Sequence, residues 1–214
     1  MKNLISLLVL ICSVAVIIVS CAKKDEESTT AATTSKTTTT PSGSITMGSY
    51  TASGVYKSSC FYGSGVSTLI SAGSFPSDAQ SFGFAFVVTG DDSFTQETHV
   101  FTDTGCTTSS YIGKALRDNV TVGTASGANY PVTYNDQGVK LTVNTTTAKT
   151  WLETLYANIG VTIDMTVGTE KAIAPASTTL TYGLWTPGAT TIYLATESTS
   201  STPSTAGSLV YTKE

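Results

Sequence analysis

The segment 82–88 constrains this chain most, because its large apolar side chains recur at every second position. Successive side chains of a β-strand point to opposite faces of a sheet, whereas a helix repeats about every 3.6 residues. A period of two therefore predicts a strand with one face against an apolar core. The residues on that face are Phe82, Phe84, Phe86 and Val88.

Further short extended segments follow along the chain, and residues that favour turns separate them. Gly90, Asp91 and Asp92 end the first strand, and an extended pattern resumes at 94–102, which predicts an antiparallel hairpin. The other strands are predicted at 46–50, 55–62, 68–71, 111–116, 119–123, 130–134, 139–144, 161–167, 179–185, 190–195 and 208–211.

One segment, 147–158, instead has the i, i+3, i+4 spacing of a helix with one apolar face. Many short strands at close spacing are typical of an antiparallel barrel or a β-sandwich. We therefore predict one all-β domain, an antiparallel β-barrel with one late helix across a mouth or edge, with a sandwich as the alternative. The apolar stripe of the helix is Ala148, Trp151, Leu152, Leu155, Tyr156 and Ile159.

The N-terminal residues have the pattern of an export signal. Lys2 precedes an apolar run at 4–19, which is short for a membrane span of roughly 20 residues. The run ends in Ile-Val-Ser-Cys at 18–21, which resembles the bacterial lipobox. The resemblance implies cleavage before Cys21, lipid on the Cys21 thiol and attachment to a membrane. The alternative is an uncleaved anchor helix that happens to contain a cysteine.

Residues 22–43 contain no large apolar side chain to bury and are rich in Thr and Ser. Such a composition predicts a disordered tether. The chain therefore divides into a signal peptide at 1–20, a lipidated cysteine with its tether at 21–43, and one β-rich domain at 44–214. Ala22 and Lys23, and not an aspartate, directly follow Cys21, and by analogy with other bacterial lipoproteins this favours the outer membrane of the cell envelope.

Two cysteines remain for the exported domain, because Cys12 leaves with the signal peptide and Cys21 carries lipid. In an oxidising compartment Cys60 and Cys106 are expected to pair as a disulfide. Two separate free thiols are the alternative. Their spacing does not match a zinc site, and we expect no metal.

The composition argues against several classes of function. The chain has 11 Lys and Arg against 15 Asp and Glu, a formal charge of −4, so no nucleic-acid partner is expected. The single histidine, His99, lies in a predicted strand beside Glu97. No nucleophile elbow and no phosphate-binding glycine loop is present. We expect a surface or barrel-lining role for His99, no catalytic residue, no cofactor and no enzyme activity.

Two further runs resemble a group of small bacterial lipoproteins with a lipocalin-like barrel. The first, at 54–60, is Gly-Val-Tyr-Lys-Ser-Ser-Cys, and the second, at 101–106, is Phe-Thr-Asp-Thr-Gly-Cys. The late helix and the closing strand Thr-Thr-Ile-Tyr-Leu at 190–194 fit the same group. The resemblance implies a lipocalin-like barrel in which the two cysteines are partners.

The aromatic residues of the strands suggest what such a barrel does. A barrel of about eight strands leaves an interior that side chains fill or that holds one small molecule. The first hypothesis is therefore a small apolar ligand, with Phe82, Phe84, Phe86 and Trp185 as lining candidates. The second is a structural or adhesive surface protein without such a site. A large apolar cavity favours the first, and a filled core with an exposed aromatic patch favours the second.

Overall fold

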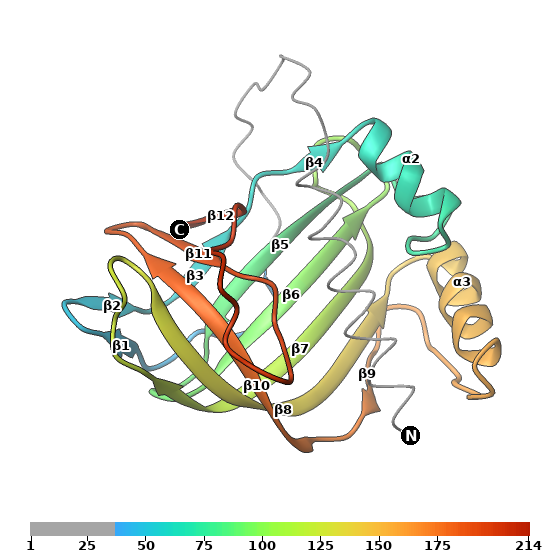
Figure 1. The fold of residues 1–214 in the computed structure, drawn as a ribbon. Coiled ribbons are helices and arrows are strands. Elements are labelled where there is room, and N and C mark those ends of the chain that lie inside the picture. The colour runs from blue at the N-terminus through green and yellow to red at the C-terminus, as the bar shows by residue number, and fades with distance from the viewer. Residues whose placement is uncertain (1–36) are drawn as a thin grey trace.

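Eight antiparallel strands close into a barrel in the computed structural model, which describes residues 37–214 (Figure 1). The ring closes where β8 (Tyr130–Val143) pairs with β10 (Ser177–Pro187). The lipocalin-like antiparallel barrel is confirmed, and the β-sandwich alternative is wrong. The remaining strands of the ring are β11 (Thr191–Leu194), β12 (Val210–Lys213), β3 (Val55–Lys57), β5 (Ser81–Val88), β6 (Phe94–Phe101) and β7 (Ser109–Val122).

The hairpin of β5 and β6 confirms the alternation on which the strand prediction was based. Phe84 pairs with Thr98 and Phe86 with Gln96, so these residues share the inner face of the barrel. The opposite face of β5 is buried as well, because Ala85 and Val87 pack with Val55 in a small second cluster. The strand is therefore buried on both faces rather than on one.

The strands β7 and β8 are longer than predicted. Each was predicted as two segments, and each is one strand of 14 residues. Their pairing shifts register between Ala115 and Arg117 and again between Asp118 and Thr121. A bulge locally reverses the alternation of faces, so a continuous bulged strand looks in sequence like two shorter strands.

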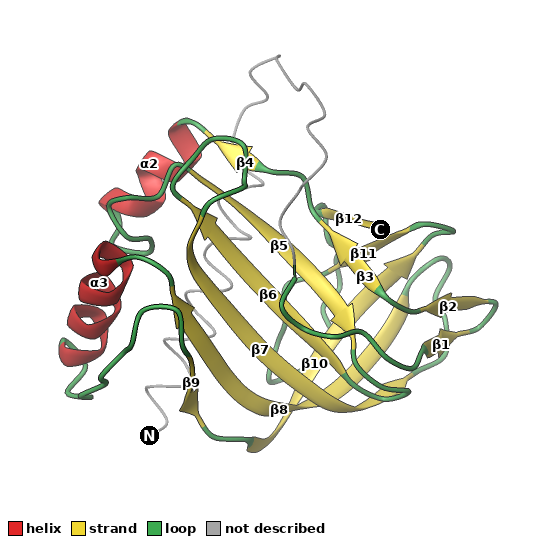
Figure 2. Ribbon diagram, turned by 180° about the vertical axis from the view of Figure 1, so that it is seen from behind, coloured by secondary structure: helices red, strands yellow, loops and turns green. Residues whose placement is uncertain are grey.

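The late helix is confirmed as α3 (Thr146–Ala157). The Thr145 side chain accepts a hydrogen bond from the Ala148 backbone N–H and caps its start, as a threonine at the N-cap is expected to do. The helix buries Ala148, Leu152 and Tyr156 against the barrel. Figures 1 and 2 show it at one end of the barrel, beside a second helix.

That second helix, α2 (Ser64–Ser71), was not predicted, and the strand predicted at 68–71 is wrong. Thr68 and Ile70 are β-branched residues, which favour strands in the absence of other contacts. In the fold, Val66 and Leu69 are the buried residues of this segment, and their spacing of three places both on one side of a helix.

The strand predicted at 161–167 is also wrong. Val161, Ile163 and Met165 alternate in sequence, but they pack against the core without joining the sheet. The Met165 backbone is held to α3 instead, because its N–H donates to Glu153 and its carbonyl accepts from Lys149. The next strand, β9 (Glu170–Ala174), was not predicted and pairs with the second half of β8.

Two other predicted strands are broken by turns. The segment predicted at 46–50 is a hairpin of β1 (Ile45–Met47) and β2 (Tyr50–Ala52), and Gly48 at the turn has a φ of 59°. The segment 55–62 divides into β3 and the short β4 (Phe61–Tyr62). Ile45 and Met47 are buried in the main core, and Figures 1 and 2 show the β1–β2 hairpin far from the helices, towards the other end of the barrel.

The predicted disulfide joins Cys60 to Cys106, which are 46 positions apart in sequence and 6.0 Å apart between Cα atoms. It connects the segment before β4 to the turn between β6 and β7. A bridge that closes a loop of this length stabilises the fold by roughly 4 kcal/mol on the chain-entropy model. The signal peptide, Cys21 and most of the predicted tether lie outside the described residues.

Candidate ligand-binding site

The four lining candidates divide between two aromatic clusters inside the barrel. Phe86 and Trp185 belong to the first, together with Phe94 and Tyr134. The rings of Phe86, Phe94 and Trp185 lie 5.0 to 5.3 Å apart between centroids. Phe86 is 0% exposed and Trp185 2%, so these side chains fill their part of the interior. We refer to this part, centred on Phe86 and Trp185, as the filled half.

Phe82 and Phe84 belong to the second cluster, nearer the helices. The Phe82 ring stacks on Phe61 and meets Phe75 edge to face, in both cases 5.2 Å away between centroids. Phe84 lies edge to face against Phe82 at 5.6 Å. Phe75 follows α2 in the chain and reaches the barrel from outside the sheet. This cluster therefore forms the boundary between the barrel interior and the helix-covered end.

A small apolar pocket lies at that end, between α3 and the inner face of β7 and β8. Its volume is about 30 Å³, close to that of one water molecule. Aliphatic and aromatic side chains provide most of its walls, and Ser74, Thr98 and Lys114 are the exceptions. We refer to it as the inner pocket. Its main walls are Phe75, Tyr111, Leu141, Trp151, Leu152 and Leu155.

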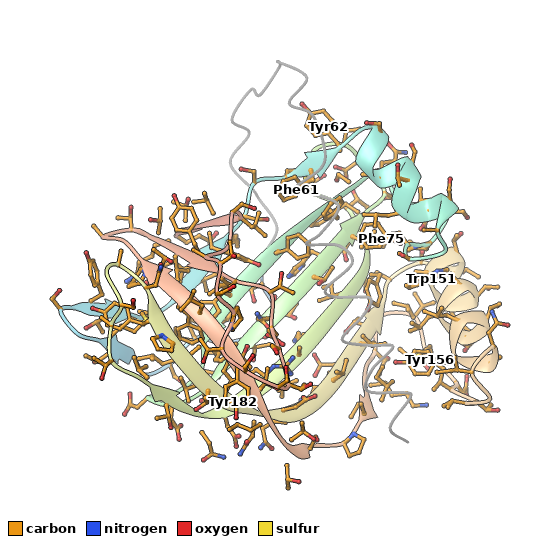
Figure 3. The ribbon with its side chains drawn as sticks, viewed as in Figure 1. Phe61, Tyr62, Phe75, Trp151, Tyr156 and Tyr182 are labelled. Atoms are coloured by element: carbon orange, nitrogen blue, oxygen red, sulfur yellow. A yellow bond between two sulfur atoms is a disulfide. The ribbon has the colours of Figure 1, made fainter. Side chains whose placement is uncertain are left out.

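A larger cleft lies on the other side of the same residues, between α2 and α3. Its volume is about 770 Å³, which is within the range of ligand sites in proteins. Ile70 and Gly73 line it from α2 and the turn after it, and Thr150 and Thr154 line it from α3. We refer to it as the outer cleft. Figure 3 shows Phe75 and Trp151 where the two helical segments approach each other.

Three side chains are common to the inner pocket and the outer cleft: Phe75, Trp151 and Leu155. The Trp151 ring is fixed by two contacts. Its Nε1–H donates to the Gly73 carbonyl at 2.9 Å, and its ring forms a T-shaped pair with Tyr111 at 5.5 Å between centroids. Trp151 therefore forms a wall between an outer cleft that carries polar side chains and an almost wholly apolar interior.

The charged groups of α3 point away from both cavities. Lys149 pairs with Glu153 and, more distantly, with Asp164. The hydrogen bond from Lys149 lowers the pKa of Glu153, and the same bond raises the pKa of Lys149. Both groups also bind the Met165 backbone, so they fasten α3 to the segment 161–167. Lys114 lines the inner pocket, but its Nζ pairs with Glu170 of β9.

His99 lies on the outer face of β6, where it hydrogen-bonds Glu97 at 2.6 Å. The Glu97 carboxylate also accepts hydrogen bonds from Thr37 and Thr39, so the last part of the predicted tether contacts the barrel wall. Burial alone would raise the pKa of Glu97, but the hydrogen bond and charge of His99, with the two hydroxyls, lower it on balance. These hydrogen bonds join the segment before β1 to β6. Neither Glu97 nor His99 lines the inner pocket or the outer cleft.

A buried charged cluster lies between β7, β8 and the segment after β11. Arg117 pairs with Asp136 at 2.9 Å and with Glu197 at 3.2 Å, and its guanidinium lies 6.0 Å from the Tyr134 ring centroid. Burial raises the pKa of the Tyr134 hydroxyl well above its usual value, and the charge of Glu197 adds to this. Because Asp136 is the last residue of β8 that pairs with β10, the cluster lies where the pairing partner of β8 changes from β10 to β9.

Comparisons of the chain with known proteins assign it to no family. No family model matches it, and no curated protein is significantly similar to it. Within residues 37–214, no helix is long and apolar enough to cross a membrane. In the same part of the chain, no three His, Cys, Asp or Glu side chains come together to hold a metal ion.

Sequence reasoning assigned the lining role to the aromatic residues of the strands and missed the residues of the helices. Trp151 and Leu155 were identified only as part of an apolar helix face, and Phe75 was not singled out. The signal for Trp151 was its place on a predicted helix across a barrel mouth. Phe75 lies in a segment with no periodic pattern, so only the fold shows that it reaches the barrel.

Proposed function

We propose that this protein is an exported, lipid-anchored protein of the bacterial envelope whose barrel binds a small apolar ligand at its helix-covered end. The observation that carries the proposal is the wall of Phe75, Trp151 and Leu155, which the inner pocket and the outer cleft have in common. An apolar group that enters from the cleft would be buried against Tyr111, Leu141 and Leu152, and each buried methylene stabilises binding by about 0.8 kcal/mol.

The inner pocket as it stands holds little more than one water molecule, so binding requires α3 to move outwards. Ala148, Leu152 and Tyr156 pack α3 against the barrel, and three polar contacts add to this packing. They are the Trp151 hydrogen bond to Gly73 and the pairing of Lys149 and Glu153 with the Met165 backbone. A helix held in this way outside the sheet can shift without breaking a strand pairing.

The two tryptophans of the chain provide a direct test, because Trp151 lines both cavities and Trp185 lies in the filled half. The full-length lipoprotein is reconstituted in phosphatidylcholine vesicles and titrated with single-chain lipids whose acyl chain carries two bromine atoms, which quench tryptophan on contact. We expect saturable quenching of the wild type and none of Trp151→Phe, which retains only Trp185. Dibrominated phosphatidylcholine, which stays in the bilayer, is the control for proximity to the membrane.

The membrane anchor has its own test. Cells that express the full chain are fed labelled palmitate, and we expect label in the wild type and none in Cys21→Ser. Separation of the two membranes should then place the labelled protein in the outer one. Equal labelling of the two proteins would contradict the lipid anchor on Cys21.

A second candidate function is presentation of a surface to another macromolecule. The observations that favour it are the filled half around Phe86 and Trp185 and the exposure of Tyr62, which is 51% exposed at the end of β4. Absence of saturable quenching by any brominated lipid would contradict the ligand-binding proposal and favour this second candidate.

A further inference from the structure

The outer cleft differs in chemistry from the inner pocket that it adjoins. Hydroxyl and amide side chains line much of it, and none of the residues that line it is charged. The walls of the inner pocket are mainly apolar. The two cavities together would accommodate a molecule with one polar end and one apolar end. The polar residues of the cleft are Ser77, Thr146, Thr147, Thr150, Thr154 and Asn158.

The polar residues of α3 form a row along one side of the helix. Thr147, Thr150, Thr154 and Asn158 follow one another at spacings of three and four, which places them one above the other on one face. Trp151 and Leu155 lie immediately beside this row and reach the inner pocket. The ion pair of Lys149 and Glu153 lies towards 161–167 instead. The helix therefore presents an uncharged hydrogen-bonding edge to the cleft.

The charge near the cleft disfavours an acidic ligand. Asp78 follows Ser77 in the chain, and its carboxylate accepts hydrogen bonds from Ser110 at 2.8 Å and from Thr145 at 2.6 Å. No lysine or arginine lines the cleft to balance a bound carboxylate or phosphate. A negatively charged head group would lose hydration without gaining an ionic partner. An uncharged head group with hydroxyls would exchange water for Thr and Asn side chains at little cost.

We infer that the site takes a single-chain amphiphile with an uncharged, hydroxyl-bearing head group, such as a monoacylglycerol. The head group lies in the outer cleft along Thr150 and Thr154, and the acyl chain passes Trp151 into the inner pocket. This inference rests on the proposed function and names its ligand class. Entry of the chain displaces the Trp151 ring and breaks its hydrogen bond to the Gly73 carbonyl, because this ring lines both cavities.

The head-group specificity is tested with two brominated lipids of identical chain length in the vesicle assay. Dibromostearoyl glycerol and dibromostearate are compared at pH 9, where the fatty acid is ionised. We expect the glycerol ester to bind at least tenfold more tightly, after correction for partition into protein-free vesicles. Equal or tighter binding of the fatty acid anion would overturn the inference while leaving the apolar site itself supported.

The location of the head group is tested by a matched pair of variants. Thr150→Phe fills the outer cleft with an apolar ring and leaves the inner pocket unchanged, since Thr150 does not line that pocket. Thr68→Phe places the same ring on the exposed side of α2, away from the cleft. We expect Thr150→Phe to weaken binding of the glycerol ester at least tenfold and Thr68→Phe to leave it unchanged. Equal affinities of the two variants would contradict the assigned position of the head group.

The passage at Trp151 is tested by kinetics. Trp151→Phe keeps an aromatic ring but removes the N–H that binds Gly73. With a fluorescent monoacylglycerol, we expect this variant to release the ligand to acceptor vesicles at least threefold faster than the wild type. An unchanged release rate would show that Trp151 does not close the passage. If the wild type binds none of the lipids, the proposed function fails, and not the head-group specificity alone.

Discussion

The filled half of the barrel and its helix-covered end use aromatic residues in opposite ways. In the filled half, Phe86, Phe94 and Trp185 come from three strands of one closed sheet and pack ring against ring. At the other end, Phe75 and Trp151 come from segments outside the sheet and separate two cavities. Strand pairing fixes the first group, whereas ring packing and one hydrogen bond hold the second. Stability and binding are thus expected to reside in different halves.

The sharpest test of this division is to truncate one tryptophan in each half. Trp185→Ala should destabilise the protein by roughly 3 to 5 kcal/mol, because it leaves a cavity between Phe86 and Phe94. Trp151→Ala should cost about 1 to 2 kcal/mol, since this side chain is only partly buried, and should abolish capture of the monoacylglycerol. Urea unfolding measures the first effect. Equal losses of stability would contradict the division.

The disulfide lies near the helix-covered end but acts on the whole barrel. Cys60→Ser with Cys106→Ser should lower the free energy of unfolding by roughly 2 to 4 kcal/mol, because the reduced chain regains the entropy of the loop between them. Urea unfolding of the double variant and of the reduced wild type should agree. Unchanged affinity for the glycerol ester under native conditions would show that the bridge supports the fold rather than the site.

The Glu97 cluster provides a pH dependence that leaves both cavities untouched. Because the pKa of Glu97 is lowered in the folded protein, its charge stabilises the fold above the ordinary value of 4.5, and this contribution is lost as the pH falls through the folded-state pKa. Glu97→Gln should cost about 1 kcal/mol at pH 7. It should also show a smaller loss of stability than the wild type between pH 6 and pH 3. An identical pH profile would contradict this role.

An effect of similar size, confined to one helix, is expected at the start of α3. Thr145→Ala removes the cap of the helix and one hydrogen bond to Asp78, which should cost about 1 kcal/mol. Thr147→Ala, on the exposed first turn, is the matched control and should change little. Hydrogen exchange of the α3 amides would measure the difference. If capping holds α3 closed, Thr145→Ala should also release the bound ligand faster.

The barrel could be predicted from the sequence because the side chains of a strand alternate between two faces, whichever strand is its partner. Phe82 to Val88 carry that pattern within themselves, 94–102 follows as an extended segment after a turn, and the structure confirms both strands. The same rule failed at 161–167, where Val161, Ile163 and Met165 alternate without a strand partner. It failed again at 68–71, where tertiary packing overrides the strand preference of single residues.

The sequence by itself determined the strand alternation, the late helix, and the pairing of the two cysteines of the domain. These depend on neighbours in the chain or on the number of cysteines. Only the tertiary structure decided that the barrel closes through β8 and β10, and that Phe86 and Trp185 fill one half. It also brought Phe75, Trp151 and Gly73 together from distant positions. Such contacts depend on how separate elements pack, and no local pattern of residues encodes that packing.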